Sequence, residues 1–204
     1  MEATPVDHPD RAGHLNNLGA FLRSRYERTG NIQDLEAAIM RLETAVEATP
    51  KDHPNRAPHL SNLRAFLNSR YERTGNLQDL EVAIARSVAA VEATPADHPN
   101  KATLLSILGI FLSSRYERTG NLQDLEAAIA RSDVAVEATP EDHPDRAGRL
   151  SILRDRFRSR YDRTGNLQDL EAAIARSEAA VEAIPKDHPG RAGCLSNLAS
   201  CFYG

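Results

Sequence analysis

The segment SRYERTGNIQDLE, residues 24–36, decides the fold because the chain repeats it almost letter for letter, with further copies that begin at Ser69, Ser114 and Ser159. The tripeptide Asp-His-Pro has the same period of 45 residues, since its histidine stands at His8, His53, His98, His143 and His188. A fixed period of this length is typical of stacked supersecondary units. The sequence therefore predicts one array over residues 1–204, with repeats at 10–54, 55–99, 100–144 and 145–189 and a partial repeat at 190–204.

Each repeat has the pattern of two helices joined by a tight turn. Leu15, Leu18 and Leu22 follow the helical spacing of a buried face, and Gly30 is the residue type that ends a helix in the left-handed conformation. Asn31 fits the N-cap of a second helix, with Asp34 as its capping-box partner. The second helix carries one apolar stripe, made of Ile32, Leu35, Ala38, Ile39, Leu42, Ala45 and Val46. The sequence predicts an all-α solenoid of about nine helices.

Composition and charge exclude several classes of protein. The formal net charge of −4 lacks the basic excess of a nucleic-acid-binding surface. The longest apolar run, residues 104–112, is far shorter than the roughly 20 residues that cross a bilayer. Cys194 and Cys201 lie too far apart on one expected helix to form a disulfide. We expect a cytoplasmic protein without a nucleic-acid or membrane partner.

No residue pattern points to catalysis, a cofactor or a metal. The histidines lie one to a repeat, so they form no cluster with metal-ligand spacing. The aspartate before each His-Pro is expected instead to accept backbone N–H groups at the start of the next helix. A nucleophile elbow and glycine-rich phosphate loops are absent from the sequence. We predict that the chain is not an enzyme.

Charged residues cluster around the turn inside each repeat. Arg25 and Arg28 recur beside Glu27, Asp34 and Glu36. Arginine suits bidentate pairing with anions, so the arginines alone would fit a basic ridge for an acidic ligand. The acidic neighbours favour a ladder of local ion pairs instead.

Two spacings resemble a known repeat family. The first helix carries Leu-x-x-Leu-Gly-x-x-Leu at Leu15, Leu18, Gly19 and Leu22. The second helix carries Ala-x-x-x-Leu-x-x-Ala-x-x-x-x-Pro at Ala38, Leu42, Ala45 and Pro50. Together they resemble the tetratricopeptide repeat (TPR), whose usual repeat has about 34 residues. The stretch DHPDRAGHLNNL, residues 7–18, resembles the repeats of kinesin light chains. The block at residues 25–39 is similar to arrays in large fungal proteins, which often lie beside a caspase-like CHAT domain or an NTPase module.

The resemblance implies a right-handed α-solenoid that binds a protein or peptide partner in a groove lined by the first helix of each repeat. Asn17 and Asn62 are the candidates for holding a peptide main chain, because an amide both donates and accepts hydrogen bonds. Ile107 and Ile110 are the candidates for an apolar anchor. The implied groove residues are Asn16, Asn17, Arg23, Ser61, Asn62, Asn68, Ser106, Ile107, Ile110, Ile152, Asp155, Arg158 and Asn197.

Two alternatives stay open beside this peptide-binding scaffold. In the first, the chain is a fragment or arm of a signalling protein whose CHAT (caspase-like peptidase) or NTPase effector domain lies outside residues 1–204. In the second, it is a spacer or self-association module, because neither end of the array carries a polar capping element.

Overall fold

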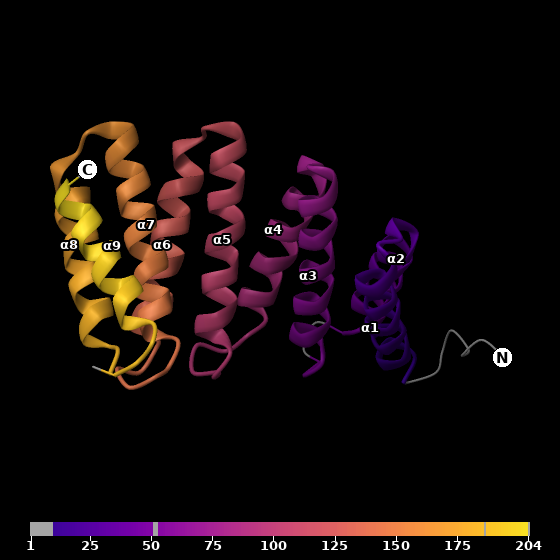
Figure 1. The fold of residues 1–204 in the computed structure, drawn as a ribbon. Coiled ribbons are helices and arrows are strands. Elements are labelled where there is room, and N and C mark those ends of the chain that lie inside the picture. The colour runs from indigo at the N-terminus through magenta and orange to yellow at the C-terminus, as the bar shows by residue number, and fades with distance from the viewer. Residues whose placement is uncertain (1–9, 51–52, 186, 204) are drawn as a thin grey trace. The chain divides into compact units, whose positions relative to one another are not determined.

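The computed structural model describes residues 10–50, 53–185 and 187–203, and within them it contains nine α-helices and no strand (Figure 1). The all-α repeat fold predicted from the sequence is confirmed. The predictions for His8 and for the Cys201 side chain fall outside the described residues. The first helices of the repeats, here called A helices, are α1 (Arg11–Thr29), α3 (Arg56–Thr74), α5 (Lys101–Thr119), α7 (Arg146–Thr164) and α9 (Arg191–Tyr203). The second helices, here called B helices, are α2 (Ile32–Ala48), α4 (Leu77–Glu92), α6 (Leu122–Glu137) and α8 (Leu167–Glu182).

The helices group into two compact units, Met1–His98 and Pro99–Gly204, which are described separately. In the N-terminal unit each A helix packs on the B helix that follows it, and α3 also packs on α2. In the C-terminal unit α7 packs on α6 and α9 on α8 in the same way. The A helices α3 and α7 are therefore each held on both sides by B helices.

The turn inside each repeat begins with glycine. Gly30 has φ 69°, in the left-handed region, and its N–H donates to the Tyr26 carbonyl over 2.7 Å. Asn31 then caps α2, because its side chain accepts the Gln33 N–H over 3.1 Å. These two residues confirm the predicted boundary between the helices.

The prediction for Asp34 as a capping-box partner is wrong. Its carboxylate accepts two hydrogen bonds from the Arg25 guanidinium, of 2.7 and 2.5 Å, while the Asn31 N–H donates to Thr29 Oγ1 over 3.3 Å. The hydrogen bond from Arg25 is the main cause that lowers the pKa of Asp34, and burial opposes it. The same pair joins helix A to helix B in the other repeats and is called the interhelix clamp; it consists of Arg25–Asp34, Arg70–Asp79, Arg115–Asp124 and Arg160–Asp169. The predicted local ion pairs are therefore confirmed.

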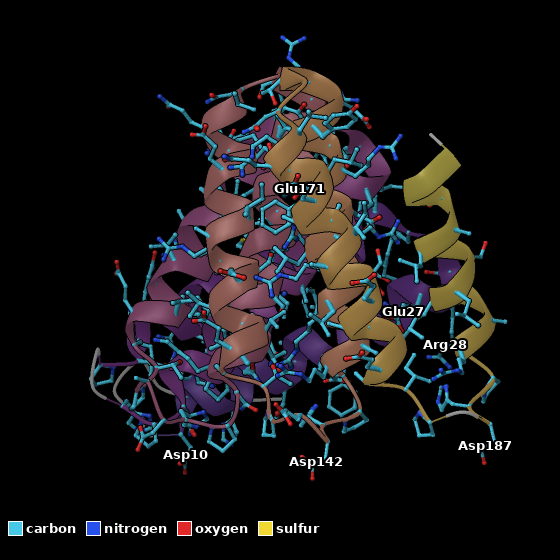
Figure 2. All side chains as sticks on the ribbon, turned by 90° about the vertical axis from the view of Figure 1, so that its left-hand side faces the viewer. Asp10, Glu27, Arg28, Asp142, Glu171 and Asp187 are labelled. Carbon is cyan, nitrogen blue, oxygen red and sulfur yellow. The ribbon has the colours of Figure 1, made fainter. Side chains whose placement is uncertain are left out.

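The loop between repeats is closed by the histidine of Asp-His-Pro. His143 Nδ1 accepts the Asp145 N–H over 3.1 Å, and the equivalent bonds from Asn55 to His53 and from Gly190 to His188 measure 3.1 and 3.0 Å. The aspartate was predicted to accept these N–H groups, and that prediction is wrong for Asp142 and Asp187; Asp7 and Asp52 lie outside the described residues. Figure 2 shows instead that the preceding aspartates project from the loops, away from the helices, at Asp142 and Asp187.

An arginine at the start of helix A caps the preceding helix B. Arg56 donates from one guanidinium nitrogen to the carbonyls of Val46, over 3.0 Å, and of Thr49. The last carbonyls of a helix have no partner within it, so the guanidinium satisfies them and suits the negative end of the helix dipole. Arg146 and Arg191 make the same contacts. The sequence analysis missed this role, although the recurrence of arginine two residues after His-Pro was its signal.

The core follows the predicted stripe of helix B, because Leu35 and Leu42 are fully buried. The prediction for Leu18 is wrong, since its side chain is 43% exposed whereas Leu63, at the same position of the next repeat, is fully buried. Helix α2 covers that face of α3. No helix of the described residues precedes α1 to cover the same face there.

Candidate functional site

The A helices of the N-terminal unit line an open pocket of about 340 Å³, here called the α1–α3 pocket. Three residues predicted for the groove, Asn16, Arg23 and Asn62, line this pocket. The other lining residues are Ala20, Ser24, Glu27 and Phe66. Polar and small side chains therefore dominate the wall.

Two asparagines join the neighbouring A helices across this pocket. Asn62 Nδ2 donates to Asn16 Oδ1 over 2.9 Å. Among the described residues, no other hydrogen bond involves either side chain, so Asn16 Nδ2 remains a free donor and Asn62 Oδ1 a free acceptor. Asn17, which the sequence analysis named with Asn62, is exposed and does not line the pocket.

The cation of the α1–α3 pocket is already engaged by the protein. Arg23 Nε lies 2.7 Å from Glu27 Oε1, and its guanidinium stacks over the Phe66 ring at 5.4 Å from the ring centre. An arginine over an aromatic face gains a cation–π attraction in addition to the ion pair. Arg23 therefore shapes the wall of the pocket, and its charge is balanced by Glu27.

A second cavity of about 190 Å³, the α5–α7 pocket, occupies the equivalent place in the C-terminal unit. Of the residues predicted for the groove, Ile110, Ile152 and Asp155 line it. Six positions of this pocket correspond to the first pocket at an offset of 90 residues. They are Ile110 for Ala20, Ser113 for Arg23, Ser114 for Ser24, Glu117 for Glu27, Ile152 for Asn62 and Arg156 for Phe66. The remaining lining residues are Tyr116, Leu125, Asp155 and Ser159.

Arg156 is the largest departure between the two pockets. It replaces a buried phenylalanine, and its own side chain is only 4% exposed. Its Nε donates to Ser113 Oγ over 2.9 Å, and NH1 lies 3.5 Å from the Ala128 carbonyl oxygen. NH1 also fills the space that a Cβ on Gly109 would need, at 2.8 Å. Burial lowers the pKa of Arg156 to about 10. Sequence reasoning missed this residue, but a comparison of the repeats at one position would have found it.

The remaining predicted groove residues lie on A helices outside these two pockets. Asn68 donates to Glu72 over 2.7 Å, and Arg158 pairs with Asp162 over 2.9 Å. Ile107 is half-buried, and the apolar wall beside Ile110 comes from Ile152 on the neighbouring helix. The full set outside the pockets is Asn17, Ser61, Asn68, Ser106, Ile107, Arg158 and Asn197.

Other kinds of site were sought in the same residues. Among those described, no three His, Cys, Asp or Glu side chains form a group that could hold a metal ion. Cys194 is a half-buried free thiol. None of the described helices combines the length and the apolar character of a membrane span.

Residues 11–55 match the family model described as tetratricopeptide repeat. The later repeats carry close copies of that segment at intervals of 45 residues. The chain is therefore an array of repeats similar to the tetratricopeptide repeat. No curated protein matches this chain significantly in sequence.

Solved structures show the same TPR-like fold. One is a crystal structure of nearly identical TPR-like repeats from a Podosopora anserina protein assigned as a kinesin light chain. It is 19% identical to this chain with a TM-score of 0.67, and the alignment covers 97% of this chain and 88% of that chain. A point variant of that protein gives 18% identity and a TM-score of 0.69, with 96% and 88% covered. A de novo designed helical repeat protein gives 15% identity and a TM-score of 0.51, with 96% and 97% covered. At these identities the likeness shows the fold alone.

Proposed function

We propose that the chain is a non-catalytic scaffold that binds an extended peptide of a partner protein along its A helices, in the cytoplasm. The match of residues 11–55 to the tetratricopeptide repeat and the TPR-like fold of the chain are consistent with a protein-interaction scaffold in general. The observation that favours a peptide in particular is the Asn16–Asn62 amide pair. This pair is the centre of the proposed site.

The amide pair offers what a peptide main chain requires. Each peptide residue other than proline carries one N–H donor and one C=O acceptor. The free Asn62 Oδ1 can accept the N–H, and the free Asn16 Nδ2 can donate to the C=O, whatever the side chains of the ligand. Ala20 and Ser24 line the same pocket, are exposed and are small, so a backbone can approach the amides.

The test begins with peptides selected from a random display library on the full chain, and it measures their affinity by titration calorimetry. We expect the double variant Asn16→Ala with Asn62→Ala to bind about 30-fold more weakly, because the two lost hydrogen bonds cost roughly 1 kcal/mol each. Asn17→Ala is the matched control, since Asn17 is exposed and outside the pocket. Unchanged affinity in the double variant, or a loss in the Asn17 control alone, would contradict the proposal.

Self-association is a second candidate that one observation favours. Phe21 on α1 is 75% exposed, whereas Phe66, at the same position of the next repeat, is 3% exposed and lies under Arg23. Leu18 adds a second exposed apolar side chain to α1. In α3 the same face is buried against the preceding repeat. The exposed face of α1 can therefore be covered by a repeat of a second copy of the chain. The further alternative, an arm of a larger CHAT or NTPase signalling protein, stays a prediction from the sequence.

A further inference from the structure

The α5–α7 pocket contains a carboxylate without a partner. In the other repeats the acidic residue at the equivalent position is held by the residue four positions earlier: Glu27 by Arg23, Glu72 by Asn68 and Asp162 by Arg158, over 2.7, 2.7 and 2.9 Å. At Glu117 that earlier residue is Ser113, whose hydroxyl accepts a hydrogen bond from Arg156. No hydrogen bond or ion pair within the described residues involves the Glu117 side chain, which is exposed.

The wall beside this carboxylate is apolar. Ile110, which is 42% exposed, and the half-buried Ile152 line the pocket where the α1–α3 pocket has Ala20 and Asn62. Long basic side chains bury their methylene stems on apolar surfaces while the charged group reaches a polar partner. Two isoleucines next to a free carboxylate therefore match the stem and the cation of a lysine or arginine.

The other charges of the pocket favour the same ligand. Arg156 is the cation at the pocket, but its guanidinium is turned into the core, toward Gly109 and Ala128. The second carboxylate, Asp155, is exposed and lies 3.0 Å from Arg154. An acidic ligand would meet the carboxylates of Glu117 and Asp155 before it reached the buried Arg156, whereas a basic ligand meets opposite charge first.

We propose that the α5–α7 pocket is a subsite for a lysine or arginine side chain of the bound peptide, with the cation on Glu117 and the stem between Ile110 and Ile152. The proposal rests on the peptide-binding function proposed above and names one side chain that the peptide carries. The α1–α3 pocket lacks the same preference, because Arg23 already neutralises Glu27 there.

The subsite can be tested with small probes on the full chain. The chain is labelled at its isoleucine methyl groups and titrated in NMR experiments with n-butylammonium and, separately, with butyrate, which has a similar stem and the opposite charge. We expect butylammonium to shift the methyl signals of Ile110 and Ile152. We also expect the chain to bind butylammonium about fivefold or more tightly than butyrate, which is the scale of one exposed ion pair. Stronger binding of butyrate, or no shift with either probe, would overturn the proposal.

Two variants assign the effect to one carboxylate. Glu117→Gln should remove the preference for butylammonium, while Glu27→Gln, the matched change in the α1–α3 pocket, should leave it intact. A preference that persists in Glu117→Gln would overturn the assignment.

Selected peptides then separate the subsite from the function. Peptides that bind the A helices, yet lose no affinity when each lysine and arginine is replaced by methionine, would refute the subsite and leave the peptide-binding function standing. Failure to select any peptide, combined with the expected butylammonium shifts, would refute the function and support the pocket's preference for a cation.

Discussion

His59 gives the N-terminal unit a sensitivity to acid. The imidazole is buried in α3, with Nδ1 3.0 Å from Thr49 Oγ1 at the end of α2. Burial is the main cause that lowers its pKa, and the charge of His53 lowers it further. The pKa of His59 in the folded chain thus lies below the ordinary value of about 6.5. At a pH between the folded and the unfolded pKa, the unfolded chain therefore binds more protons than the folded chain. The free energy of unfolding must therefore fall as pH drops through this window.

The measurement compares urea unfolding midpoints at pH values of about 7.5 and 5. We expect the urea midpoint of His59→Gln to fall less between the two pH values than the midpoint of the wild type. The reason is that the variant lacks the group that gains a proton on unfolding. His14→Gln is the control from the first repeat, where the equivalent histidine is exposed. An identical loss in His59→Gln and the wild type would contradict the role of His59.

Arg156 is a second residue for which the direction of the change in stability on replacement can be predicted. The buried guanidinium stands where the first three repeats have Phe21, Phe66 and Phe111, and no ion pair of the described residues joins it to a carboxylate. Replacing a buried charged group by an apolar residue of similar volume is often stabilising. We expect Arg156→Phe to raise the free energy of unfolding by about 1 kcal/mol or more, and Arg156→Ala to lower it through the cavity it leaves. A loss of stability in Arg156→Phe, measured in urea, would contradict this account.

The interhelix clamp links the two helices of each repeat through a charged pair. Asp79 is buried and accepts two hydrogen bonds from the partly exposed Arg70, of 2.9 and 2.6 Å. Arg70→Ala leaves the carboxylate buried without its cation, so we expect the free energy of unfolding to fall by about 1–3 kcal/mol. Arg73→Ala, at an exposed position of the same helix end, should change it by less than about 0.5 kcal/mol. Equal effects of the two variants in urea unfolding would contradict the clamp.

The helices could be predicted because their ends depend on local residues. Gly30 and Asn31 act through their own backbone and the next turn, so their spacing in the sequence was sufficient. The capping-box prediction failed for Asp34 because the competing partner, Arg25, lies on the preceding helix and reaches the carboxylate only after the helices pack. Sequence spacing alone does not show which of two donors a carboxylate will take.

The candidate site was predicted less well because it depends on how neighbouring A helices are turned. Successive residues of a helix point about 100° apart, so a sequence pattern does not show which of two adjacent asparagines faces the next A helix: Asn16 lines the pocket and Asn17 does not. Ile110 and Ile152 were both predicted for the groove, but the sequence did not show that they line the same pocket. The hydrogen bonds between neighbouring A helices that line the pockets join residues more than 40 positions apart, and only the packed helices show them.

At the scale of the whole molecule, self-association depends on the exposed face of α1. If a second copy covers Phe21 and Leu18, the mass measured by light scattering should rise with protein concentration, and Phe21→Ser should remove that rise because it takes away the largest exposed apolar side chain of α1. Val134→Ser, an exposed apolar position on α6, is the control and should behave as the wild type. A wild-type chain that stays monomeric over the whole concentration series would exclude this candidate.

The central claim is that an extended peptide binds along the A helices, and the most direct measurement is amide chemical-shift mapping of the full chain during titration with a display-selected peptide. The account predicts that the largest shifts fall on α1 and α3 around Asn16 and Asn62, and that they disappear in the double alanine variant. Shifts confined to the B helices, or a pattern unchanged in the double variant, would contradict it.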